Sequence, residues 1–158
     1  MKVIKTNAIR ILDQAKLAYE ISCYEHGKDA LDGITVASIL HQNPDIVFKT
    51  LVTKGNNNDY YVFVVPVAHE LNLKKCAKAV GVKHIEMIHV RDINTITGYI
   101  RGGCSPIGMK KHYPTIIHES CLQYTTILFS GGKIGIQIAM SPNDLISLIH
   151  AKTADIIQ

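Results

Sequence analysis

A lysine within an apolar strand is the residue in this chain best suited to carry chemistry. Residues 47–53 (VFKTLVT) are rich in β-branched and aromatic side chains, which favours a strand. Because strand side chains alternate between two faces, Lys49 shares a face with Val47 and Leu51, and Thr50 lies on the other face. An enclosed ammonium requires a counter-charge or a lowered pKa, whereas a lysine on an edge strand can extend to water. Lys49 is therefore a candidate cation for an anionic ligand, with a solvated edge position as the alternative.

A glycine-rich loop at residues 98–108 (GYIRGGCSPIG) is the second candidate. Glycines let main-chain N–H groups approach a ligand, and successive N–H groups can bind a carbonyl that becomes an oxyanion. A plain crossover between a helix and a strand has the same composition. Ser105 sits in a poor hydrolase elbow, because Ile107 replaces the closing glycine. Cys104 as a nucleophile would need its thiol pKa lowered, for which Arg101 is the nearby cation; a small incidental residue is the simpler interpretation.

Cysteine and histidine spacing argues against metal chemistry. The four cysteines are scattered without a CxxC pair, and the eight histidines form no HxxxH or HExxH pattern. Reduced thiols are expected. The sequence therefore predicts no metal site and no cofactor.

Three segments together resemble the YbaK/EbsC family of free-standing aminoacyl-tRNA deacylases, which is related to the editing insertion domain of bacterial prolyl-tRNA synthetase. The segments are residues 48–52, 97–108 and 130–138, in matching order and spacing over nearly the whole chain. The resemblance implies that Lys49 is the family's single functional lysine. It also implies that the loop from Gly102 through Gly103 to Pro106 matches the family's Gly-x-x-x-Pro loop, whose backbone positions the substrate carbonyl. Lys49, Gly102, Gly103 and Pro106 are therefore the expected catalytic residues.

The same resemblance implies a set of substrate contacts. Gln137 stands where some family deacylases have an aspartate, so a general base there is in doubt, and this amide could at most orient a water, an amine or a ribose hydroxyl. Without the resemblance, residues 130–133 are more simply a tight turn, and Tyr24 an exposed strand tyrosine. The expected substrate-binding residues are Tyr24, Thr50, Cys104, Ser105, Ser130, Gly131 and Gln137.

The function that this resemblance implies is removal of cysteine mischarged onto proline tRNA, with Cys-tRNA(Cys) as a second substrate. A lysine general base would need a strongly lowered pKa, so we favour Lys49 as a permanent cation that holds a phosphate or ribose. The nucleophile would then be the thiol of the cysteinyl group itself. The expected partners are the acceptor end of aminoacyl-tRNA and, transiently, prolyl-tRNA synthetase, with no DNA and no membrane. The alternatives are a deacylase for Ala-tRNA(Pro) or another small aminoacyl-tRNA, and a non-catalytic module that binds aminoacyl-adenosine.

Periodicity and turn residues predict an α+β fold. Residues 47–53 and 60–65 flank a strong turn sequence at 55–59, which indicates a β-hairpin. The resemblance sharpens this to a curved, barrel-like mixed or antiparallel sheet of six to seven strands flanked by helices. The other expected strands are residues 19–24, 85–88, 115–118, 126–130 and 134–140, and the expected helices are 7–17, 35–41, 72–80, 91–97 and 141 onward, with caps at Thr6 or Asn7, Thr35, Asn72 and Ser141.

Composition is that of an ordinary globular protein. The 158 residues are 47% hydrophobic and 19% charged, enough for one core, so a single domain over residues 1–158 is predicted. The formal net charge of +4 permits polyanion binding without requiring it. No stretch approaches the ~20 apolar residues of a membrane span, and the first residues lack a signal-peptide core, so a cytoplasmic location is expected.

Overall fold

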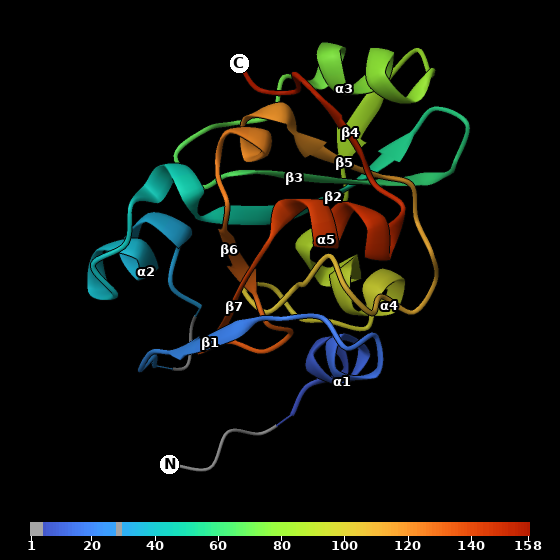
Figure 1. The fold of residues 1–158 in the computed structure, drawn as a ribbon. Coiled ribbons are helices and arrows are strands. Elements are labelled where there is room, and N and C mark those ends of the chain that lie inside the picture. The colour runs from blue at the N-terminus through green and yellow to red at the C-terminus, as the bar shows by residue number, and fades with distance from the viewer. Residues whose placement is uncertain (1–4, 28–29) are drawn as a thin grey trace.

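Two sheets organise the chain in the computed structural model, which describes residues 5–27 and 30–158 (Figure 1). The larger sheet has five strands in the order β4-β2-β3-β5-β8, and the smaller has three in the order β1-β7-β6. The strands are β1 (Glu20–Cys23), β2 (Phe48–Gly55), β3 (Tyr60–Pro66), β4 (Ile85–Met87), β5 (Thr115–His118), β6 (Ile127–Ser130), β7 (Ile136–Met140) and β8 (Lys152–Ala154). The helices are α1 (Asn7–Gln14), α2 (Gly33–Ile39), α3 (Leu73–Val80), α4 (Ile93–Thr97) and α5 (Pro142–Ile149), with 3-10 turns at Pro44–Ile46, Val90–Asp92 and Glu119–Gln123.

The predicted hairpin of β2 and β3 is the centre of the larger sheet. The two strands pair antiparallel from Phe48 opposite Pro66 to Lys54 opposite Tyr60. Asn58 closes the turn with φ of 68°, a left-handed conformation that asparagine tolerates better than most residues. This register places Lys49 opposite Val65.

The remaining strands of this sheet make it mixed. β4 is antiparallel to the far end of β2, whereas β5 is parallel to β3 and β8 is parallel to β5. β8 was not predicted, because Lys152, Thr153 and Ala154 carry no apolar alternation. Pairing with β5 supplies the strand that the local sequence does not specify.

The smaller sheet is wholly antiparallel and includes the second predicted hairpin. Ser130 in β6 lies opposite Gln137 in β7, and β7 pairs in turn with β1. An isolated parallel bridge from Val47 to Leu128 joins this sheet to the larger one.

The predicted barrel is wrong. Within residues 5–27 and 30–158 neither sheet closes, since β4 and β8 end the larger sheet and β1 and β6 end the smaller one. The described strands number eight, not six or seven, and fall into two open sheets. Between the two sheets the described residues form a bridge at one pair, Val47 directly before β2 and Leu128 of β6, in place of a full ladder. The local sequence does not show which strand edges will pair.

The main core lies between the two sheets and the helices α1 and α5. It contains Ile9, Phe48, Ile117, Phe129 and Leu145, all buried. A second cluster, which includes Phe63 and Cys76, packs α3 against the opposite face of the larger sheet. Figure 1 shows this layering, with α3 above the larger sheet and α5, α1 and the smaller sheet below it.

Most predicted helix caps are confirmed. The side chains of Thr6, Asn72 and Ser141 accept hydrogen bonds from the first turns of α1, α3 and α5, and Gly81 ends α3 with φ of 78°. The cap of α2 is Asp32, not Thr35: Asp32 Oδ1 accepts the Thr35 main-chain N–H at 2.8 Å. Asp32 displaces the predicted cap because α2 begins two residues earlier, at Gly33.

The described part of the chain contains no helix of the length and apolarity that crossing a membrane requires. Residues 155–158 contact the loop between β3 and α3 and also α3 itself. The Gln158 main-chain N–H donates to Glu70 O at 3.1 Å, and Lys75 Nζ lies 2.8 Å from Asp155 Oδ2. Residues 155–158 are thus part of the folded structure.

Candidate functional site

A cleft of about 890 Å³ lies where the two sheets meet. Residues from β2, β6 and β7 line it, together with the start of α2, the segment after β4 and the glycine-rich loop. The predicted site residues along its wall are Tyr24, Lys49, Thr50, Gly102, Cys104, Ser130 and Gln137. The fold therefore brings together residues from all three segments that carried the family resemblance.

Lys49 reaches this cleft from a place where β2 has one hydrogen-bonded neighbour. β3 pairs with β2 at Lys49, but β4 covers only residues 53–55. The side chain is 27% exposed, and its Nζ lies 3.5 Å from Glu70 Oε1. The Glu70 side chain is 78% exposed, so water screens this pair and the contact is weak. An anionic ligand can displace Glu70 at little cost.

Thr50 lines the cleft from the opposite face of the same strand. Its Oγ1 is buried and has no hydrogen-bond partner among the described residues. A buried hydroxyl without a partner is destabilising, and a ligand that supplied one would gain from it.

Three residues of the glycine-rich loop, Arg101, Gly102 and Cys104, line the cleft. Gly102 has φ of 82°, and a side chain there would lie 2.2 Å from the Ala30 Cβ. The Gly103 N–H is used internally, since it donates to Ile100 O at 2.9 Å. Within the described residues the N–H groups of Gly102 and Cys104 donate to no protein acceptor. The Arg101 N–H likewise has no acceptor among these residues, so the N–H groups of Arg101, Gly102 and Cys104 are the loop donors available to a substrate oxygen.

Four predicted site residues do not line the cleft. Gly103 packs against the backbone of Lys133 and Ile134, and Gly131 is tied to Ile136 within the β6–β7 hairpin. Ser105 is fully buried, and its Oγ accepts the Ile107 N–H at 3.3 Å. Pro106 borders a separate cavity of about 200 Å³ beside Ile11 and Tyr113. In this structure Gly103, Ser105 and Pro106 support the conformation of the glycine-rich loop, and Gly131 supports that of the β6–β7 hairpin.

The Cys104 thiol is protonated at neutral pH. Burial raises its pKa to about 11, and a hydrogen bond with the Thr97 side chain offsets only part of that rise. Arg101 therefore does not activate this thiol, contrary to the effect considered from its position in the sequence. The uncharged Cys104 thiol is part of the cleft wall.

Gln137 is 4% exposed and lies on β7 between Ser22 of β1 and Ser130 of β6. Its Oε1 accepts a hydrogen bond from Gln42 Nε2 at 2.7 Å. Sequence reasoning missed Gln42, which follows α2 and lies 95 residues from its partner. No local pattern around Gln42 distinguishes it from a surface glutamine.

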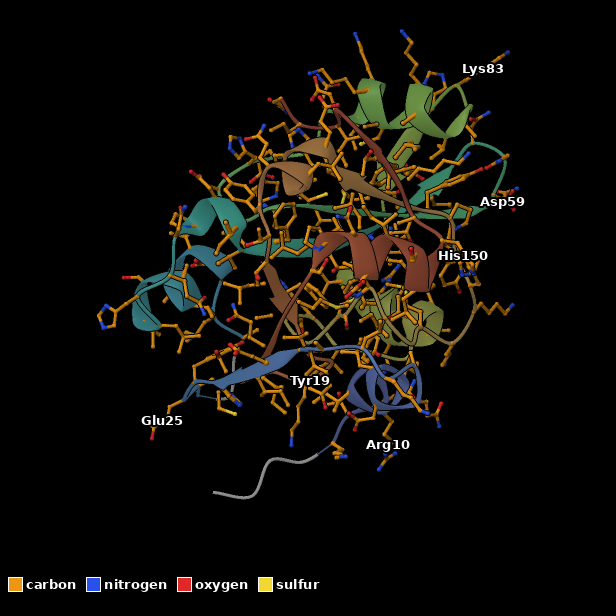
Figure 2. All side chains as sticks on the ribbon, in the orientation of Figure 1. Arg10, Tyr19, Glu25, Asp59, Lys83 and His150 are labelled. Atoms are coloured by element: carbon orange, nitrogen blue, oxygen red, sulfur yellow. The ribbon has the colours of Figure 1, made fainter. Side chains whose placement is uncertain are left out.

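Charged groups at the cleft are few and mixed in sign. Lys49 and Arg101 are its basic residues, and Asp32 and Glu70 its acidic ones, among the residues described. Figure 2 shows Arg10, Glu25 and Lys83 projecting outward at separate places on the molecule. No group of three or more histidine, cysteine or acidic side chains in residues 5–27 and 30–158 could hold a metal ion.

Comparison with known proteins identifies the family. A model of the aminoacyl-tRNA editing domain matches residues 29–148. This chain belongs to the aminoacyl-tRNA editing domain family. A protein of Enterococcus faecalis named as a Cys-tRNA(Pro)/Cys-tRNA(Cys) deacylase, EbsC, is 46% identical over 152 residues, covering 96% of this chain and 93% of that protein.

Solved structures support the fold of this editing domain. The crystal structure of the hypothetical protein APE2540 matches with a TM-score of 0.87 at 19% identity, over 97% of this chain and all of the other. A structure described as a trans-editing enzyme for prolyl-tRNA synthetase matches with a TM-score of 0.81 at 22% identity, over 99% of both chains. The protein is therefore an enzyme with an aminoacyl-tRNA editing domain, and the cleft is the candidate site for deacylation.

Proposed function

We propose that this editing enzyme deacylates cysteine mischarged onto proline tRNA, and that it also accepts Cys-tRNA(Cys). The observation that carries this proposal is that one cleft is lined both by Lys49 and by Gly102 and Cys104, whose main-chain N–H groups have no acceptor in the described part of the chain. A cation and two N–H donors suit an ester of adenosine, which offers phosphate, ribose and carbonyl oxygens. The volume of about 890 Å³ lies within the usual range for a site that encloses a small ligand.

Lys49 acts in this proposal as a cation, not as a base. The Glu70 carboxylate lies 3.5 Å from its Nζ as a counter-ion, and an ammonium cannot accept a proton. Because Glu70 is largely exposed, a terminal phosphate or a ribose oxygen can take its place beside Lys49. Lys49 would thus anchor the end of the tRNA while the glycine-rich loop holds the ester carbonyl.

The substrate supplies the nucleophile. The cysteinyl sulfur attacks its own ester carbonyl, a carbon–sulfur bond forms, and the bond from that carbon to the ribose oxygen breaks. The thiol proton goes to the ribose oxygen, so free tRNA leaves, and water then hydrolyses the cyclic thioester to cysteine. The neutral Gln137 and the protonated Cys104 agree with this route, because neither serves as a base or a nucleophile.

Prolyl-tRNA synthetase is the expected source of the substrate in this proposal. In this proposal the cleft holds the aminoacyl-adenosine alone, so the rest of the tRNA lies outside it and the protein has little surface with which to distinguish one tRNA from another. A transient complex with the synthetase in the cytoplasm would supply that selectivity. We expect added prolyl-tRNA synthetase to accelerate deacylation of Cys-tRNA(Pro) more than of Cys-tRNA(Cys), as measured with purified components.

Substrate comparison tests the chemistry. The protein is incubated with Cys-tRNA(Pro), Ala-tRNA(Pro) and Ser-tRNA, and the remaining ester is followed over time. The proposal expects rapid loss of the cysteinyl ester alone, because alanyl and seryl groups offer no internal thiol. Equal rates for the alanyl ester would overturn the substrate-assisted mechanism and favour the alternative editing specificity.

Substitution of Lys49 tests the site. We expect Lys49→Met to lower kcat/KM by about 10- to 100-fold, the value of one or two hydrogen bonds from a charged group. Glu70→Gln is the matched control, since it removes the partner charge at an exposed position and should change the rate by less than about threefold. Equal activity of wild type and Lys49→Met would show that Lys49 has no role in deacylation.

A further inference from the structure

Gln42 and Gln137 form a side-chain pair that connects the cleft to the segment behind it. Gln42 Nε2 donates to Gln137 Oε1 at 2.7 Å. Gln137 lines the cleft and is 4% exposed, whereas Gln42 lies in the segment between α2 and the 3-10 turn Pro44–Ile46. The Gln42 backbone is itself held, since its N–H donates to Ala37 O at 2.8 Å.

The hydrogen-bond inventory decides which way the two amides face. Gln42 Oε1 is buried and has no partner among the described residues. If both amides were rotated, the Gln42 amide nitrogen would occupy that sealed position with its N–H groups unpaired. Buried carbonyl oxygens without a partner are tolerated more often than buried N–H groups, so the observed orientation is favoured.

This orientation determines what Gln137 can offer a ligand. Its carbonyl oxygen is engaged by Gln42, and its Nε2 makes no hydrogen bond with the described protein residues. An amide nitrogen only donates. An α-ammonium group also only donates, so the two cannot bind each other. The acceptors on an aminoacyl-ribose are its carbonyl, ester and hydroxyl oxygens.

We propose that Gln42 is a positioning residue, which holds the Gln137 amide with its nitrogen toward the cleft so that it donates to an oxygen of the aminoacyl-ribose. The inference rests on the proposed function of the cleft. It assigns selectivity at this position to the acyl ester and ribose, and excludes recognition of the substrate's amino group by Gln137.

Three substitutions of Gln42 separate orientation from packing. Gln42→Glu places an acceptor beside Gln137, which turns the Gln137 nitrogen toward residue 42 and its oxygen toward the cleft. We expect this variant to lower kcat/KM about tenfold, mainly through KM. Gln42→Lys keeps a donor at this position and should stay within about threefold of wild type. Gln42→Met removes the hydrogen bond to Gln137, and its kcat/KM should lie between those of the other two variants. Melting temperatures of all three variants show whether any of them is destabilised.

A double-mutant cycle with Gln137→Met tests whether Gln42 acts through Gln137. In the Gln137→Met background, Gln42→Glu should lower kcat/KM by less than about twofold further. An equal loss in both backgrounds, or no loss in either, would overturn the proposal. Equal losses for Gln42→Glu and Gln42→Lys would also overturn it, because a packing role does not distinguish an acceptor from a donor.

A binding measurement keeps this inference separate from the proposed reaction. The probe is 3′-cysteinylamino-3′-deoxyadenosine, which cannot be hydrolysed as an ester, and the readout is the side-chain amide resonance of Gln137. We expect that resonance to shift on binding to the wild type and not with Gln42→Glu. If the wild type binds the probe with this shift yet leaves Cys-tRNA(Pro) intact, the proposed function fails alone. Binding without a shift in the wild type overturns the role of Gln137.

Discussion

Cys104 is a thiol at the candidate active site that the fold keeps protonated. With a pKa raised to about 11 by burial, about one molecule in a thousand carries the thiolate at pH 8. We expect Cys104→Ala to retain deacylation within about threefold and to leave its pH dependence unchanged. Cys23→Ala, at a partly exposed position on β1, is the matched control for loss of a thiol. A loss above tenfold confined to Cys104→Ala, measured with Cys-tRNA(Pro), would assign the thiol a direct role.

Single residues differ in how far the sequence could reveal them. Lys49 could be predicted because a cation in an apolar strand contradicts its surroundings within seven residues of sequence. Glu70 and Gln42 could not be predicted. Glu70 reaches Lys49, and Gln42 reaches Gln137, only because of where β3 and α2 end in the folded chain. Ser105 looked like a ligand contact in the motif, yet its hydroxyl serves its own turn.

At the scale of elements, the glycine-rich loop depends on two features of Gly102. Its left-handed φ of 82° strains any side chain, and a Cβ there would collide with Ala30. We expect Gly102→Ala to lower the free energy of unfolding by about 1–2 kcal/mol and kcat/KM by more than tenfold, since the loop must move.

Gly81 provides the control for that variant. It ends α3 with φ of 78° and has open space around its Cβ position. Gly81→Ala should cost about 1 kcal/mol of stability through the same strain and leave deacylation unchanged. Urea unfolding and kcat/KM measured on both variants separate the two effects. Equal activity of the two variants would mean that the position of the loop does not matter for the reaction.

Helices and strands could be predicted where a few neighbouring residues specify them. The β2–β3 hairpin follows from turn residues between two apolar runs, and the caps of α3 and α5 from Asn72 and Ser141. β8 and the division into two open sheets were not predictable, because both depend on which edges meet after the chain has folded. The sequence motifs indicated which segments form the candidate site, but not which of their side chains line the cleft. Four of the predicted site residues do not line it.

For the molecule as a whole, the buried thiols make the free energy of unfolding depend on pH in the alkaline range. Burial raises the pKa of Cys76, Cys104 and Cys121 to about 11, whereas in the unfolded chain these thiols ionise near 9.0, the ordinary value for a thiol. As pH rises above about 9, the unfolded state loses these protons first and is stabilised. We expect the free energy of unfolding to fall by about 1 kcal/mol for each buried thiol at pH 10.

Urea unfolding at pH 7, 8, 9 and 10 measures this fall. The Cys76→Ala/Cys121→Ala double variant is the control: it begins less stable because of two small cavities, but its stability should decline less steeply. A decline as steep as that of the wild type would show that other groups cause it. The Tyr99 phenol, with a pKa raised to about 12, contributes only at still higher pH.

Gln158 lies 88 residues after Glu70 in the sequence, yet its main-chain N–H donates to the Glu70 carbonyl, in the loop from which the Glu70 side chain faces Lys49. Leu71 and Ile157 form an antiparallel bridge next to this hydrogen bond. Lys75 Nζ donates to both Asp155 Oδ2 and the Ile157 carbonyl. The place of the Glu70 counter-ion beside Lys49 is therefore set in part by residues 155–158, which lie far from both in the sequence.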